Sequence, residues 1–339
     1  MLTHYIALLV LSVCVGPLAA QQPRPSTQGL WQEHMALGEH LERQGSYMEA
    51  KEEFRLGLAA IGADQAEAQQ FVTDIHLAAV SAQLGQYTEA EQWGNRAMLS
   101  GISLYGADGV ELAVPLLNLA IVYRDQNQNA KAEQAGRRVL ELLAKRDSHH
   151  SVALAATMGT LGTVLYRRGE LRESEQLLRQ GIEEAEKLGA SNLNVLAENL
   201  SSLAVLCRHT GRQSEAASLF QRAYLLYEQA YGVEHPELVP ILTALATLKA
   251  DSGEYPEAIQ ENEHAVRLAE RAWGPNHPLI RYALLDEASW LRKLHRKDEA
   301  KRLESRARAI EKATAQNSLA RYTVDARDVA ALPPSRPHR

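Results

Sequence analysis

Histidine and cysteine in this 339-residue chain could bind a metal ion, and cysteine could also act as a nucleophile. His34 and His40 are six residues apart, so on a helix they would point to different sides and could not share a metal ion. His149 and His150 lie at a boundary between two predicted helical units, where a solvated turn is favoured over a pair of metal ligands. Cys207 falls on the inward side of a predicted helix, and we interpret it as a small buried apolar residue rather than a nucleophile.

The sequence carries none of the short motifs that mark common catalytic sites. It has no phosphate-binding G-x-x-x-x-G-K-[ST] loop, no G-x-S-x-G nucleophile elbow, no H-E-x-x-H pair and no C-x-x-C. We therefore predict that the protein is not an enzyme and that it uses no cofactor and no metal ion. A catalytic function is the third choice, and an acid–base pair in a deep pocket would favour it.

A recurring glutamate resembles a catalytic carboxylate only when a single copy is considered alone. The chain repeats itself about every 42 residues around an anchor position that is usually glycine. The anchors are Gly45, Gly85, Asn127, Gly169, Gly211, Gly253 and His295. A glutamate follows by four residues at Glu49, Glu89, Glu173, Glu215, Glu257 and Glu299, and Lys131 is the exception. Six copies at one offset indicate a role in the first turn of a helix, where a carboxylate suits the helix dipole and capping.

Small and apolar residues recur in the same register and predict stacked helical hairpins. Five residues after the anchors stand Ala50, Ala90, Ala132, Ser174, Ala216, Ala258 and Ala300. Eight residues before them stand Leu37, Leu77, Leu119, Leu161, Leu203 and Leu245, and Glu287 breaks the row. Glycine at the anchor can take a positive φ just past a helix end, and small residues let two helices approach closely. Self-similarity at this period is typical of repeat proteins, in which neighbouring units bury one continuous core.

Within this register, short segments resemble the tetratricopeptide repeat family. Residues 119–123 (Leu-Ala-Ile-Val-Tyr) match its L-G-x-x-Y motif with alanine for glycine, and residues 50–54 and 216–220 match A-x-x-x-F. The long period and the junctions at 231–236 and 273–278 resemble the kinesin-light-chain subtype. HEAT and armadillo repeats share the period, but the Gly-x-Tyr-x-Glu-Ala turns at Gly45 and Gly85 favour the tetratricopeptide interpretation. The resemblance implies an all-α, right-handed superhelical solenoid of about seven helical hairpins.

The same resemblance implies a ligand-binding groove, because first helices line the concave surface in that family. The residues that follow the L-G-x-x-Y segment form two rows. One row is Glu42, Ala82, Arg124, Tyr166, Arg208, Ala250 and Arg292, and the other is Arg43, Gln83, Asp125, Arg167, His209, Asp251 and Lys293. The candidate groove residues are Arg124, Asp125, Tyr166, Arg167, Arg208, His209, Arg292 and Lys293. Arginine binds carboxylates in a bidentate geometry, so the expected partner is a protein or peptide that is acidic or ends in a carboxylate. The alternative is that these arginines are common in the repeat and only solvated.

The first residues of the chain form a different kind of segment. Residues 6–15 are almost wholly apolar and are followed by Leu18-Ala19-Ala20, which predicts a secretory signal peptide cleaved before Gln21. The segment lacks Lys and Arg, so an uncleaved or lipid-anchored form and a buried N-terminal helix remain alternatives. The run is shorter than the roughly 20 residues of a transmembrane helix, and we expect no integral membrane span. A net charge of −6 argues against nucleic-acid binding.

The predicted organisation is a signal peptide at 1–20, a linker at 21–28, a solenoid at 29–316 and a disordered tail at 317–339. The seven units cover about 29–62, 63–106, 107–147, 148–189, 190–232, 233–274 and 275–316. The predicted function is a non-catalytic scaffold for protein–protein or protein–peptide interaction, exported to the periplasm or secreted. The alternative is a regulatory or accessory subunit of a separate enzyme or of an envelope assembly.

Overall fold

Fourteen α-helices make up the chain in the computed structural model, which describes residues 27–62, 66–145 and 151–320. The helices are α1 (Thr27–Arg43), α2 (Tyr47–Ala59), α3 (Ala66–Gln83), α4 (Tyr87–Tyr105), α5 (Ala113–Asp125), α6 (Asn129–Lys145), α7 (Val152–Arg168), α8 (Leu171–Lys187), α9 (Leu193–His209), α10 (Gln213–Tyr231), α11 (Val239–Asp251), α12 (Tyr255–Trp273), α13 (Pro278–Lys293) and α14 (Lys297–Ala320). Short 3-10 turns η1 (Val110–Leu112), η2 (Gly189–Asn192) and η3 (Pro236–Leu238) precede α5, α9 and α11. The described residues contain no β-strand, so the predicted all-α class is confirmed.

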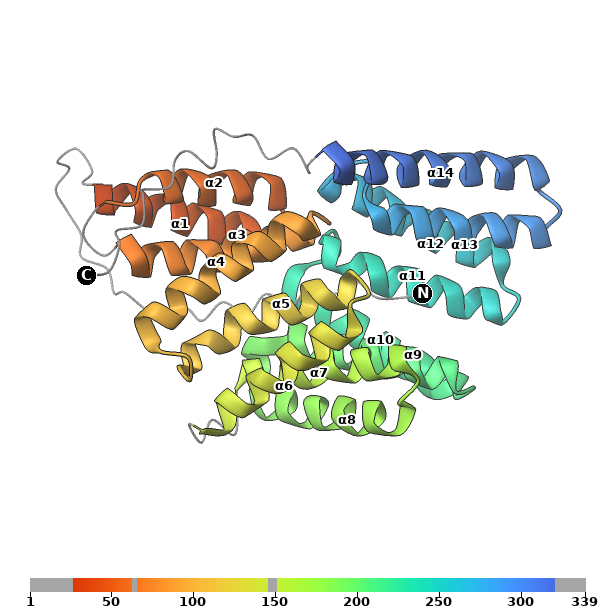
Figure 1. Ribbon diagram of the computed structural model, residues 1–339. Helices are drawn as coiled ribbons and strands as arrows, with labels where there is room; N and C mark the ends of the chain where they lie inside the picture. The colour runs from red at the N-terminus through yellow and green to blue at the C-terminus, as the bar shows by residue number, and fades with distance from the viewer. Residues whose placement is uncertain (1–26, 63–65, 146–150, 321–339) are drawn as a thin grey trace.

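Consecutive helices pair as seven antiparallel hairpins, α1 with α2 through α13 with α14, and each hairpin packs on the next. We number these hairpins as units 1 to 7. Figure 1 shows that the stack follows a curved path, which brings the last units back beside the first. The signal peptide and most of the linker predicted at the N-terminus lie outside the described residues. At the other end, α14 continues to Ala320, four residues into the segment predicted as a tail, because no glycine or proline interrupts the sequence there.

The anchor position between the two helices of each unit takes a left-handed backbone conformation. Five anchors are glycines with φ from +68° to +86°, and the two exceptions, Asn127 and His295, take φ of 60° and 62°. A residue of positive φ just past a helix end lets the chain reverse direction. The prediction made from the glycine spacing is therefore confirmed at all seven positions, including the two that are not glycine.

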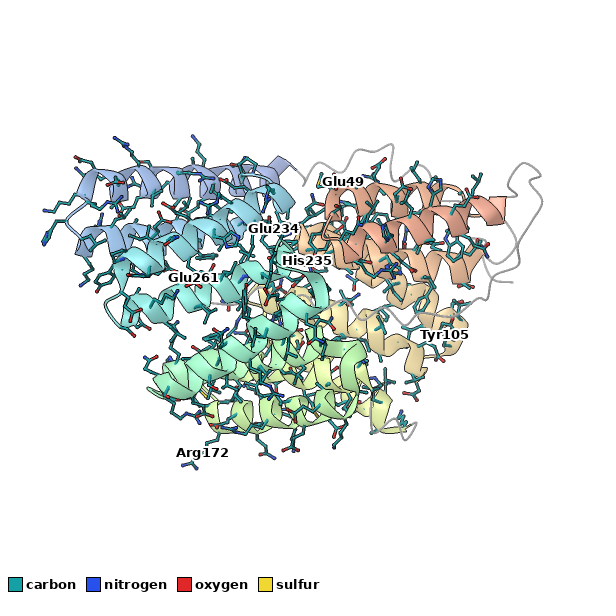
Figure 2. All side chains as sticks on the ribbon, turned by 180° about the vertical axis from the view of Figure 1, so that it is seen from behind. Glu49, Tyr105, Arg172, Glu234, His235 and Glu261 are labelled. Atoms are coloured by element: carbon teal, nitrogen blue, oxygen red, sulfur yellow. The ribbon has the colours of Figure 1, made fainter. Side chains whose placement is uncertain are left out.

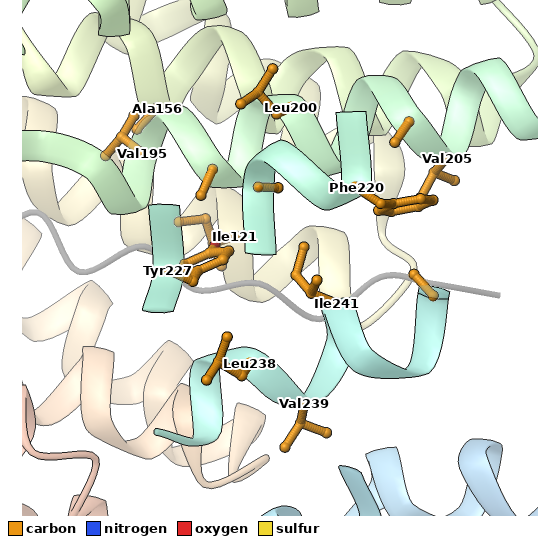
Figure 3. Close-up of a cluster of buried hydrophobic side chains, with 14 of the residues drawn as sticks. Ile121, Ala156, Val195, Leu200, Val205, Phe220, Tyr227, Leu238, Val239 and Ile241 are labelled. Atoms are coloured by element: carbon orange, nitrogen blue, oxygen red, sulfur yellow. The ribbon is translucent and has the colours of Figure 1, made fainter. Parts of the chain in front are cut away.

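The small row after the anchor lies in the core of the solenoid. Its seven members, Ala50, Ala90, Ala132, Ser174, Ala216, Ala258 and Ala300, are all 0% exposed. The leucine row packs between units: Leu119 lies against Gly94 of the preceding unit, and Leu161 lies against Gly136. Leu37, in the first unit that the structure describes, is 46% exposed. Figure 3 shows part of the main core cluster, to which Ile121 of unit 3, Phe220 of unit 5 and Ile241 of unit 6 contribute.

Glu287, which breaks the leucine row, is buried and has a polar partner in the preceding unit. The Asn262 side chain occupies the position that Gly94 and Gly136 hold in earlier units, and its Nδ2 donates a hydrogen bond to Glu287 Oε2 at 2.9 Å. Asn262 is fully buried and Glu287 is 6% exposed. A leucine–glycine contact is thus replaced by a hydrogen bond between two buried polar side chains, which offsets part of the cost of burying them.

The recurring glutamate lies in the first turn of the second helix, as predicted. Two of its copies also form ion pairs between units. Glu173 pairs with Arg137 of the preceding unit at 3.3 Å, and Glu215 pairs with Arg179 at 2.9 Å. The repeated carboxylate therefore links the outer helices of neighbouring units.

Candidate functional site

The candidate groove residues occupy the C-terminal ends of the first helices of units 3, 4, 5 and 7. In units 3 to 6 these ends touch one another. The Arg167 guanidinium donates a hydrogen bond to the backbone carbonyl of Arg124. The rings of Tyr166 and His209 meet edge to face at 5.4 Å. Arg208 Nη1 lies 3.3 Å from Asp251 Oδ2. The structure therefore brings the middle of the two predicted rows together as one strip.

The last two candidates belong to a different neighbourhood. Arg292 Nη2 lies 2.6 Å from Glu304 Oε1, which belongs to α14 of the same unit. The side chain of Arg292 is 58% exposed, and Lys293 is exposed as well. These two residues are positively charged surface positions of unit 7 and do not extend the strip formed by units 3 to 6.

Arg124 does not face solvent, which the repeat register alone did not predict. Its side chain is 2% exposed, and its Nε donates to Asp125 Oδ1 at 2.9 Å. Its Nη1 lies 3.6 Å from Oε1 of Glu198, another buried residue. Burial raises the pKa of Glu198 to about 8, so at neutral pH the charge that balances Arg124 is that of Asp125. Arg124 is thus part of a buried ion pair and does not present its guanidinium to a ligand in this structure.

Arg167 lies between this buried pair and the more open part of the strip. Burial and the neighbouring Arg124 lower the pKa of Arg167 to about 10, while Asp125 opposes this shift. Tyr87 of unit 2 and Tyr282 of unit 7 also act on Arg167, so residues from opposite ends of the chain converge around it. Burial likewise raises the pKa of Tyr87 well above its ordinary value.

This convergence comes from a long-range contact that the sequence did not reveal. The turns of units 1 and 2 lie against the junctions that precede units 6 and 7. A Cβ atom at Gly45 would lie 2.5 Å from Pro236 Cδ, and one at Gly85 would lie 3.3 Å from Pro278 Cδ. Figure 2 shows His235 where the C-terminal units meet the first ones. We call this contact the clasp; its residues are Gly45, Tyr47, Gln83 and Gly85 on one side and His235, Pro236, Glu237, His277 and Pro278 on the other.

Glu237 is the polar centre of the clasp. Its Oε1 accepts hydrogen bonds from Tyr47 Oη and from Gln83 Nε2, both at 2.9 Å and both from the other end of the chain. Glu237 is 9% exposed, and burial raises its pKa to about 7 against the two hydrogen bonds, which lower it. Burial lowers the pKa of the neighbouring His235 to about 4, so this imidazole is neutral near pH 7.

A narrow crevice remains between the two ends of the chain at the clasp. Gln83, Tyr87 and Asp125 line one side of it, and Glu237, Trp273 and His277 line the other, with Ala82, Pro236, Pro240 and Leu279. The crevice is only wide enough for about one water molecule. The crevice is therefore too narrow to admit a peptide.

Sequence signals for the clasp exist, but none of them points to contact across the chain. Gln83 stands in one predicted groove row, and Tyr47 follows its anchor by two residues as Tyr87 and Tyr255 do. The two His-Pro junctions repeat at 42 residues, and their sequence is typical of a helix start. The structure shows this role as well, because His235 Nδ1 accepts a hydrogen bond from the backbone N–H of Glu237. Contacts 190 residues apart depend on the curvature of the whole stack, which no local pattern specifies.

Neither a metal site nor a reactive thiol emerges from the part of the chain that the structure describes. Those residues hold no group of three or more His, Cys, Asp and Glu side chains placed to bind a metal ion. Cys207 is 0% exposed, as predicted, and burial raises the pKa of its thiol to about 11. Among the described helices, none has the length and apolar character needed to cross a lipid bilayer.

Comparison with protein families settles the architecture. A tetratricopeptide repeat family model matches residues 69–145, 152–229, 195–271 and 237–313. The chain belongs to the tetratricopeptide repeat family. The predicted resemblance is thereby confirmed, and no catalytic family was identified for this tetratricopeptide repeat protein. A search of curated proteins gives no match.

Solved structures of similar fold include two complexes with a bound factor or peptide. A Rap protein in complex with the competence and sporulation factor is 14% identical, with a TM-score of 0.62 over 88% of this chain and 89% of that one. NprR in complex with its cognate peptide NprX is 13% identical, with a TM-score of 0.63 over 87% and 82%. At these identities the similarity shows the fold alone. A kinesin-light-chain repeat protein from Podosopora anserina is 20% identical, with a TM-score of 0.42 over 59% of this chain and 94% of that one.

Proposed function

We propose that this tetratricopeptide repeat protein is a non-catalytic scaffold that binds a protein or peptide on the inner ends of the first helices of units 4 to 6. The observation that carries the proposal is the continuous strip of Tyr166, Arg167, Arg208, His209 and Asp251. Successive units contribute these residues, so one extended segment can touch several of them. Rap and NprR, which share the fold, are each seen with a bound factor or peptide, and this supports a ligand of the same kind.

The chemistry of the strip favours a partner with a carboxylate. The side chain of Arg208 is less than a quarter exposed and lies against the carboxylate of Asp251. The charge of Asp286 also interacts with that of Arg208. A ligand carboxylate would replace Asp251 as the partner of a guanidinium that is held in place by its neighbours. Such charge-assisted hydrogen bonds each contribute roughly 1.5–3 kcal/mol. Tyr166 and His209 add an aromatic pair on which an apolar side chain can rest.

The test begins with the native partner, identified by affinity capture on the mature chain followed by mass spectrometry. A triple variant, Arg167→Ala, Arg208→Ala and His209→Ala, should then capture at least tenfold less of the purified partner, because each lost charge-assisted contact weakens binding. Arg124 is left unchanged because its guanidinium is buried. Circular dichroism of the variant should remain helical.

A matched control removes three positive charges from the outer helices instead. Arg137, Arg179 and Arg222 are about half exposed, and each forms ion pairs with outer-helix glutamates. Their replacement by alanine should leave capture unchanged. Equal capture by the wild type and by the strip variant, with both folded, would refute the assignment of this surface and leave the solenoid intact.

We also propose that the protein is exported. The apolar segment at residues 6–15 and the small residues before Gln21 support this part of the proposal. They lie outside the described residues, so the support comes from the sequence.

A further inference from the structure

The clasp consists of two equivalent contacts rather than one. The turn of unit 1 meets the junction before unit 6, and the turn of unit 2 meets the junction before unit 7. Each turn is a glycine of positive φ, and each junction is a His-Pro pair whose histidine is buried. The same spacing, from one unit to the fifth that follows, therefore closes the solenoid twice.

Glu237 is unusual within this closure because an acidic side chain is buried where the two ends of the chain meet. Its hydrogen-bond partners Tyr47 and Gln83 are neutral and come from α2 and α3, across the clasp. Glu42 of α1 and Tyr231 of α10 face the same region. Burial raises the pKa of Tyr47, and the charge of Glu42 adds to this shift. Burial also raises the pKa of Tyr231, and the charge of Glu237 adds to that shift.

Other titratable groups surround Glu237 from the remaining elements. Glu198 of α9 interacts with the charge of Glu237, and its burial keeps it mostly neutral below pH 8. His235 stands two residues before it, and Tyr87, Asp125 and His277 line the same crevice from α4, α5 and the start of α13. No cation that would balance a Glu237 carboxylate faces it among these groups, so ionisation leaves a buried negative charge with only neutral donors.

Ionisation of Glu237 therefore acts against closure. In the closed state burial raises the pKa of Glu237 to about 7, whereas a solvated glutamate has an ordinary value of 4.5. Between these two values the closed state holds a proton that the open state has lost, so rising pH favours the open state. Below pH 4.5 both states are protonated, and above pH 7 both are ionised, so the effect is confined to this window.

Opening would change what the interior of the solenoid can bind. The crevice between Gln83, Tyr87 and Asp125 on one side and Trp273 and His277 on the other is too narrow for a peptide. Separation of these two sides would join the interior of units 2 and 3 to the strip of Tyr166, Arg167 and Arg208. This consequence rests on the proposed function, in which the inner ends of the first helices bind the partner.

We propose that the clasp is reversible, that ionisation of Glu237 releases it, and that its release admits a protein or peptide to the full interior face.

The experiment measures the distance between the two ends of the free protein as pH changes. Spin labels are attached at Glu52→Cys on α2 and at Arg267→Cys on α12, two helices that contact each other in the closed structure. The background carries Cys14→Ser and Cys207→Ala so that only these thiols react. Electron–electron double resonance then gives the fraction of short distances from pH 4.5 to pH 9, while circular dichroism checks that the helices persist.

In the wild-type background, the ratio of closed to open protein should fall about tenfold per pH unit between pH 4.5 and 7 and then level off, about 300-fold in all. The Glu237→Gln variant keeps an oxygen for Tyr47 and Gln83 but carries no charge, so it should stay closed across the range. Glu234→Gln, three residues away and exposed, should titrate like the wild type. Labels at Arg222→Cys and Arg267→Cys, on α10 and α12 of neighbouring units, should report a constant distance.

Two results would overturn the proposal: a wild-type distance that does not change with pH, or a Glu237→Gln variant that opens as the wild type does. The measurement uses no partner, so its outcome is separate from that of the capture experiment. Loss of capture in the strip variant together with a clasp that never opens would support the binding surface and refute its regulation.

Discussion

Glu198 offers the sharpest quantitative test of the buried charges inside the solenoid. It lies on α9, is 3% exposed, and faces Arg124, whose ion pair is with Asp125. Burial raises the pKa of Glu198 from its ordinary 4.5 to about 8. We expect Glu198→Gln to remove this titration while preserving the shape of the side chain and an oxygen that can accept from Arg124.

The expected magnitude follows from the two pKa values of Glu198. Between pH 4.5 and 8 the unfolded chain has lost the proton that the folded chain keeps, so the free energy of unfolding falls as pH rises. Each pKa unit corresponds to about 1.4 kcal/mol, so the loss reaches about 5 kcal/mol by pH 8 and is constant above it. The Glu198→Gln variant should lack this slope and should be more stable than the wild type at pH 9, although the two are similar near pH 5.

Urea unfolding followed by circular dichroism at pH 5, 7 and 9 measures the difference. Glu237 contributes its own slope, of about 3 kcal/mol by pH 7, and this slope is shared by the wild type and the Glu198→Gln variant. Glu183→Gln, an exposed change on α8, is the matched control and should behave as the wild type. If the Glu198→Gln midpoints fall with pH as steeply as those of the wild type, Glu198 is ionised in the folded protein and the reasoning from burial is wrong.

Three further predictions concern packing, the buried ion pair and export. Ala223 is 0% exposed in α10, so Ala223→Glu should disrupt the contact between units 5 and 6. The free energy of unfolding in urea should fall by several kcal/mol, and an unchanged urea midpoint would contradict the packing. Arg124→Ala leaves the buried carboxylate of Asp125 unpaired and should cost about 3–5 kcal/mol in thermal unfolding, whereas an unaltered melting temperature would show that the pair is solvated. The mature protein should begin near Gln21 by N-terminal sequencing of exported material, and a start at Met1 would refute cleavage.

The helical hairpins could be predicted because every unit repeats the same local requirement. A positive φ at the anchor, a small residue five positions later and a leucine eight positions earlier each appear many times, and the structure places them as expected. Even Asn127 and His295 obey the register, since the turn geometry is imposed by the helices on both sides. The exception at Glu287 was visible in the sequence, but its partner Asn262 was not, because that contact depends on which residue faces it in the preceding unit.

The candidate site was predicted less completely than the fold. The structure has Tyr166, Arg167 and Arg208 at the C-terminal ends of successive first helices, and their role in binding a partner remains a prediction. The register could not distinguish Arg124 from them, because the burial of Arg124 depends on contacts with residues of other units, among them Glu198 of α9 and Tyr87 of α4. The curvature of the stack is the sum of small rotations between successive units. It brings Gln83 into hydrogen-bond contact with Glu237, which lies 154 positions later in the sequence.

The spacing of the clasp gives the repeat number a meaning that an open stack would lack. The turn of a unit contacts the junction that precedes the fifth unit after it. An array of five hairpins would therefore lack this contact, and adding or removing a hairpin would not break it. With seven, an inserted or deleted hairpin between units 2 and 6 would move Glu237 out of reach of Tyr47 and Gln83 together. The length of this array is therefore constrained as in a closed ring, where removing any member affects its most distant parts.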